Sequence, residues 1–84
     1  SALMGKALAL EGLGNYIEAA NSMAAAADKI DAKDPRHFDA LYSAGEFYQH
    51  AGRANDAVKY FEMVAKDGTG DLKDRATIAA AMLK

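Results

Sequence analysis

LGNYIEAA at Leu13–Ala20 and AGRANDAV at Ala51–Val58 are two versions of one pattern. In each stretch, a glycine turn precedes the start of a helix that contains an acid and then an alanine. Gly52 follows Gly14 by 38 residues, and a recurrence at this spacing indicates a protein built from helical repeats. Proteins of this kind mostly bind other proteins, so the pattern favours a binding function.

The composition sets the class of protein. The chain has 84 residues, of which 51% are hydrophobic and 26% charged, with one proline, as in an ordered helical domain. A net charge of −2, without clustered Lys and Arg, argues against a nucleic-acid partner. The absence of cysteine excludes disulfides and thiolate metal sites. No apolar run reaches the roughly 20 residues that span a bilayer, so we expect no membrane insertion by this segment. Both the cytoplasm and the bacterial periplasm remain open as locations.

The helix start and stop signals along the chain predict five helices. Glycines at 12 and 14 are expected to end the first, and Asp34-Pro35 is a strong start signal for the third, with Asp as the N-cap and Pro at the first helical position. Asp71 is the expected cap of the last helix. Short breaks make successive helices antiparallel neighbours, so the prediction is an all-α fold of helical hairpins. The expected helices cover residues 2–11, 15–30, 35–50, 54–66 and 71–84.

The second unit resembles a tetratricopeptide repeat (TPR). It has apolar, small and aromatic residues at the positions that the family pattern requires: Leu41, Ala44, Gly45, Tyr48, Gly52, Ala57 and Phe61. The first unit matches more loosely, and the last helix carries Ile78, Ala79 and Met82 in the same register. Gly45 and Ala57 are small where the two helices of a hairpin approach closely. Thr69 replaces the closing proline of the family, and Arg75 stands where the last helix should have a large apolar residue.

The resemblance implies a short right-handed superhelix of two repeats and one extra helix. The repeats would cover about 2–31 and 35–67, and a half repeat or capping helix about 71–84. The apolar Ile78–Leu83 stretch has no partner helix after it, and repeat arrays need a polar cap at each end. We therefore expect the chain to be part of a longer protein. The break before Asp71 is also similar to those of TPR proteins of the bacterial envelope, which implies an anchor helix upstream of Leu3.

The resemblance further implies a function: a non-catalytic scaffold that binds a peptide or partner surface in a concave groove. By register, the groove candidates are Met4, Leu8, Glu11, Asp39, Tyr42, Glu46, Gln49, Lys73, Thr77 and Ala80, with Ser43 and His50 at the edges. The competing interpretation is that these are solvated helix faces. A second functional reading is a structural oligomerisation module whose exposed terminal helices self-associate.

Other sites are disfavoured by the residues. The carboxylate clamp of cochaperone TPR domains needs several cations, and among the matching positions only Lys73 is one. Tyr42, Tyr48 and His50 could form an aromatic patch, although Tyr48 in the core and a half-buried Tyr42 is the simpler reading. His37 and His50 are too far apart along one helix to share a metal. No nucleophile–base arrangement appears, so we expect no enzyme activity, metal or cofactor.

Overall fold

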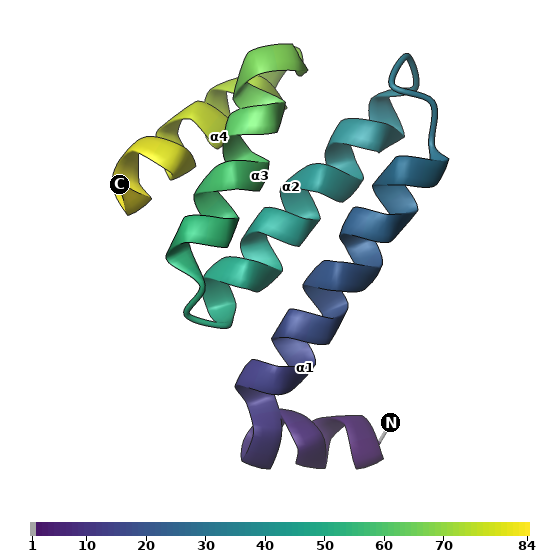
Figure 1. The fold of residues 1–84 in the computed structure, drawn as a ribbon, viewed down its shortest axis with the longest axis vertical. Coiled ribbons are helices and arrows are strands. Elements are labelled where there is room, and N and C mark those ends of the chain that lie inside the picture. Colours follow the sequence, from purple (N-terminus) through teal and green to yellow (C-terminus); the bar gives the residue numbers. More distant parts are fainter. Residues whose placement is uncertain (1) are drawn as a thin grey trace.

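Four helices, stacked in chain order, make up the part of the chain that the structure describes (Figure 1). The structure is a computed structural model; it describes the backbone of residues 2–84 and the side chains of residues 14–84. The helices are α1 (Ala2–Lys29), α2 (Pro35–His50), α3 (Ala54–Asp67) and α4 (Gly70–Leu83), and this range contains no strand. Each helix runs antiparallel to the one before it, which confirms the predicted all-α architecture of helical hairpins.

The prediction of a break at Gly12 and Gly14 is wrong. The backbone stays helical from Ala2 to Lys29, so the predicted helices 2–11 and 15–30 are one helix and the hairpin between them does not exist. A glycine often ends a helix by adopting a positive φ. Among the described glycines, Gly52 at the end of α2 and Gly70 at the start of α4 have a positive φ, whereas Gly14 does not. A glycine inside a helix costs about 1 kcal/mol relative to alanine. The alanine-rich remainder of α1 tolerates that cost.

The start of α2 is as predicted. Asp34 is the N-cap, with extended backbone angles (φ −88°, ψ 124°), and Pro35 is the first helical residue. The Asp34 carboxylate accepts a hydrogen bond from the Arg36 backbone N–H at 3.0 Å, which satisfies one of the helix-start donors that have no partner within the helix. At the far end, Gly52 adopts φ 77° and turns the chain into α3.

The connection from α3 to α4 is shorter than predicted. Gly68 donates its backbone N–H to the Val64 carbonyl at 2.7 Å and closes α3. The N-cap of α4 is Thr69, and the helix begins at Gly70, so the prediction of Asp71 as the cap is wrong. Gly70 has φ 64°, a value that glycine adopts without steric cost. Asp71 instead lies in the first turn, where its negative charge favours the helix dipole.

The buried core contains residues from all four helices. Phe61 and Val64 are the largest fully buried side chains among the described residues. A Cβ built on Gly45 would lie 2.8 Å from Cε1 of Phe61, so the absence of a side chain at Gly45 is what admits the ring. Ala57 is also fully buried. The predicted close approach of the two helices is confirmed at Gly45, where the Phe61 ring of α3 takes up the space of a side chain.

Tyr48 joins three helices. Its ring is buried and stacks on Tyr60 of α3, with ring centroids 5.5 Å apart. Its hydroxyl donates a hydrogen bond to the Asn21 side-chain oxygen on α1. Within the described residues, α1 packs on α2 and on no other helix, so this phenol is part of the interface that joins α1 to the rest of the fold.

Candidate functional site

The candidate site is one exposed stripe along α2, which we call the α2 row: Asp39, Tyr42, Glu46 and Gln49. Intervals of three and four residues place these side chains on one side of the helix. Asp39, Glu46 and Gln49 are exposed and Tyr42 is half-buried. The row therefore consists of an anchored aromatic ring with a carboxylate about one turn before it and another about one turn after it.

Tyr42 is held from two sides. Its ring packs on Phe61, with centroids 5.2 Å apart and planes tilted by 54°. The guanidinium carbon of Arg75 on α4 lies 5.4 Å from the centre of the Tyr42 ring, within the range of a cation–π interaction. Because Phe61 is buried in the core, the ring is a rigid part of the surface rather than a mobile side chain.

Arg75 is the residue of this site that the sequence reasoning missed. In the repeat pattern, Arg75 stands where a large apolar side chain is expected, and the sequence assigns the arginine no role. The structure instead makes it the link between α4 and the α2 row. The contact between this guanidinium and the half-buried Tyr42 cannot be read from residue spacing alone, because it depends on how α4 packs on α3.

The two carboxylates of the α2 row have no ion-pair partner among the side chains of residues 14–84. Within the described residues, the ion pairs are Arg36–Asp34 at 2.6 Å, Arg53–Asp56 at 3.5 Å and Lys84–Glu62 at 2.6 Å. None of them involves Asp39 or Glu46. Both carboxylates are therefore available to a cation from outside this part of the chain.

Of the groove candidates on α4, some are exposed and one is buried by the packing of the helix. Lys73 and Thr77 are exposed, as the groove assignment requires. The Thr77 hydroxyl donates to the Lys73 carbonyl at 2.8 Å, so its donor is used within the helix. The prediction that Ala80 lies on the groove is wrong, because its exposure is 4% and it packs in the core.

The remaining groove candidates have mixed outcomes. Met4, Leu8 and Glu11 lie outside the residues whose side chains the structure describes. Ser43 is half-buried.

His50 is exposed and stacks on Tyr16 of α1, with ring centroids 5.3 Å apart. Tyr48 is buried while Tyr42 is half-buried, so the three side chains Tyr42, Tyr48 and His50 do not form one exposed aromatic patch.

His37 has a structural role at the end of α1. Its Nδ1 lies 2.8 Å from the Ala27 carbonyl and 3.1 Å from the Ile30 carbonyl. Because both partners are acceptors, Nδ1 carries the hydrogen and donates it to carbonyls near the end of α1. The Ala27 carbonyl also accepts the Ile30 backbone N–H at 3.1 Å. The side chains described by the structure contain no group of three or more His, Asp and Glu that could hold a metal ion.

The surroundings of Asp34 and Tyr48 shift the pKa values of these two side chains. The side-chain and backbone hydrogen bonds from Arg36 lower the pKa of the Asp34 carboxyl from 3.8 to about 2. Burial raises the pKa of the Tyr48 phenol, and the nearby Tyr60 and Asp56 add to that rise. Neither group belongs to the α2 row, so both shifts report on the fold.

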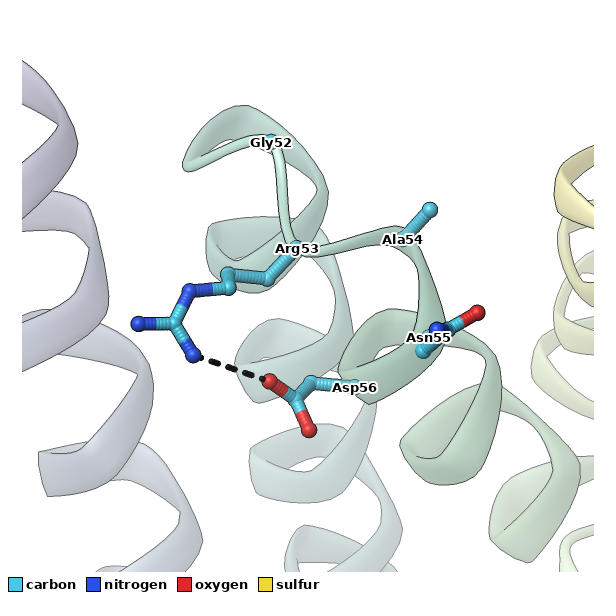
Figure 2. Close-up of a pocket in the computed structure, with 5 residues that line it drawn as sticks. All are labelled: Gly52, Arg53, Ala54, Asn55 and Asp56. Atoms are coloured by element: carbon cyan, nitrogen blue, oxygen red, sulfur yellow. Dashed lines mark ion pairs between the residues drawn. The ribbon is translucent and has the colours of Figure 1, made fainter.

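A shallow hollow at the α2–α3 turn is a second candidate site (Figure 2). Its volume is about 440 Å³, and Gly52, Arg53, Ala54, Asn55 and Asp56 line it. Figure 2 shows Arg53 and Asp56 reaching toward each other, in the ion pair already described. None of these five lining residues is buried, so the hollow has no buried polar side chain among its lining residues to hold a ligand.

Three large apolar side chains are exposed in the described part of the chain. Ile78 is 59% exposed and Met82 80% exposed, on the side of α4 turned away from the buried Ala76 and Ala80. Met63 on α3 is 39% exposed. Within residues 2–84, none of the helices has the length and the apolar character needed to cross a membrane.

Comparisons with known proteins add no relative to these observations. No protein-family model, no curated protein and no solved structure matches this chain.

Proposed function

We propose that this chain is a non-catalytic, TPR-like interaction module that binds a peptide or partner surface along the α2 row, with Lys73 and Thr77 of α4 at its edge. The observation that carries the proposal is the combination at the α2 row of a ring packed from two sides and two carboxylates with no ion-pair partner among residues 14–84. Binding sites rely on aromatic anchors that lose little conformational freedom on binding, surrounded by polar groups that give specificity.

The architecture supports the same proposal. Stacked helical hairpins expose long helix faces on which an extended segment can lie. The α2 row spans eleven residues of one helix, from Asp39 to Gln49, which corresponds to about 15 Å at a rise of about 1.5 Å per residue. That length accommodates a peptide of about five extended residues.

A peptide selection tests the proposal without knowledge of the natural partner. The folded chain is immobilised and used to select peptides from a random 12-residue phage library. Selected peptides are then synthesised, and their affinities are measured by fluorescence anisotropy. We expect binding that weakens about tenfold for Tyr42→Ala, a loss usual for an aromatic anchor.

Three variants separate binding from folding. Tyr42→Phe keeps the ring and its contact with Phe61, so it should bind nearly as well as the original chain. Glu46→Gln changes a charge of the α2 row, whereas Asp67→Asn makes the same change at an exposed position on α3. The proposal is wrong if no peptide is enriched, or if the selected peptides bind the Tyr42→Ala and Glu46→Gln variants as tightly as the original chain, with circular dichroism showing that both are folded.

A further inference from the structure

The contact between Arg75 and Tyr42 indicates what kind of group the α2 row accepts. A guanidinium lies over the ring at 5.4 Å from its centre, although Arg75 is exposed and has no ion-pair partner among the described residues. The Arg75 side chain could extend into water, yet its guanidinium lies on the Tyr42 ring. The ring face is a site for a cation, and here a side chain of the same chain occupies it.

The surrounding charges favour a second cation at the same place. Asp39 precedes Tyr42 by three residues and Glu46 follows it by four, so both carboxylates lie on the same side of α2 as the ring. Arg75 does not approach either of them closely enough to form an ion pair. A cation that bound between the two carboxylates would make charge-assisted hydrogen bonds that Arg75 does not make.

We infer that the partner of the α2 row is a basic segment, whose arginine takes the place of Arg75 on the Tyr42 ring and bonds to Asp39 or Glu46. This inference rests on the proposed function and names the chemical class of its ligand. Arginine fits better than lysine because its planar guanidinium can stack on a ring and bond a carboxylate at the same time. Arg75 thus acts as an internal competitor that a basic ligand displaces.

The test uses three synthetic peptides of the same length. Each has twelve residues with three variable positions separated by Gly-Ser units, and these positions are all arginine, all lysine or all glutamine. Binding is followed by the amide chemical shifts of the chain in two-dimensional NMR. We expect the arginine peptide to shift the amides around Tyr42, the lysine peptide to do so more weakly, and the glutamine peptide to leave them unchanged.

Removal of the competitor is the decisive variant. Arg75→Gln frees the ring, and an exposed cation–π contact corresponds to a change of about two- to fivefold in affinity. We therefore expect the arginine peptide to bind Arg75→Gln about two- to fivefold more tightly than the original chain. Part of this gain would come from a net charge that is more negative by one unit. The same charge change is made elsewhere by Lys59→Gln on the exposed side of α3, and this variant should bind less tightly than Arg75→Gln.

Neutralisation of the carboxylates provides the opposite change. Asp39→Asn and Glu46→Gln should each weaken binding of the arginine peptide several-fold, while Asp67→Asn, with the same change in net charge, should have a smaller effect. The inference is overturned if Arg75→Gln binds no more tightly than Lys59→Gln, or if the glutamine peptide binds as well as the arginine peptide. Library peptides that depend on Tyr42 but contain no arginine or lysine would also overturn it, while leaving the proposed function intact.

Discussion

The substitution Gly45→Ala tests the packing on which the α2–α3 hairpin depends. The new Cβ would lie 2.8 Å from Cε1, 2.9 Å from Cδ1 and 3.1 Å from Cζ of Phe61. Carbon atoms pack at about 3.5–4.0 Å, so either the ring or the helix must move by more than half an ångström. The ring has little room, because its exposure is 1% and Tyr42 packs against it.

Two effects of opposite sign determine the size of the change. Overpacking a core costs about 1–3 kcal/mol, while replacing glycine by alanine inside a helix gains about 1 kcal/mol. Because Phe61 is enclosed, we expect the upper part of the first range and a net loss of about 1–2 kcal/mol. A loss of 1 kcal/mol lowers Tm by roughly 4–8 °C in a domain of this size.

Gly14→Ala is the matched control. Gly14 lies inside α1 and is exposed, and a Cβ built on it would meet nothing within 4 Å. The same chemical change there should stabilise the chain by about 0.5–1 kcal/mol. Urea unfolding followed by circular dichroism measures both variants. If Gly45→Ala is as stable as the original chain, the close contact between Gly45 and Phe61 does not exist as described.

The other predictions concern the cap, the buried phenol and the α2–α3 turn. The folded state lowers the pKa of Asp34 to about 2. The charged carboxylate therefore stabilises the fold above pH 3.8, and this contribution disappears as the pH falls toward 2. Asp34→Asn should remove it and so flatten the acid side of a plot of Tm against pH. The pKa of Tyr48 is raised in the folded state, so the neutral phenol stabilises the fold below pH 10 and that contribution is lost as the pH rises through the folded pKa. Tyr48→Phe should remove this loss of stability at alkaline pH. At neutral pH, Tyr48→Phe should cost about 1 kcal/mol in urea unfolding, for the lost hydrogen bond to Asn21. Gly52→Ala forces a side chain into φ 77° and should cost about 1–2 kcal/mol, and a Tm equal to that of the original chain would contradict this.

The parts of the fold that sequence could predict depend on residues with one dominant local effect. Asp34 and Pro35 together allow little other than a helix start, and Gly52 at positive φ ends the hairpin turn. The close approach at Gly45 followed from small residues at the helix crossing. Gly12 and Gly14 have no such single effect, because a glycine can end a helix or remain inside it, and the choice depends on whether α2 packs against the continuous helix.

The candidate site was predictable in its α2 part and less so in its α4 part. The exposure of Asp39, Glu46 and Gln49 follows from the period of α2, whose opposite side is apolar. On α4 the rotation of the helix about its axis decides which residues are exposed, and contact with α3 sets that rotation. This is why Ala80 is buried and why Arg75, rather than Lys73, contacts Tyr42.

The serial packing of the helices also determines how the protein opens. In the described part of the chain, α4 contacts α3 and touches α2 at a few points, and no contact joins it to α1. A transient detachment of α4 would therefore break the α3–α4 interface and leave the α1–α2 pair in place, as in a sub-global unfolding unit. The same event would carry Arg75 away from Tyr42. Local stability of the last helix and access to the tyrosine are thus thermodynamically linked, so a substitution that loosens α4 at a distance from the α2 row would also change how often that row is uncovered.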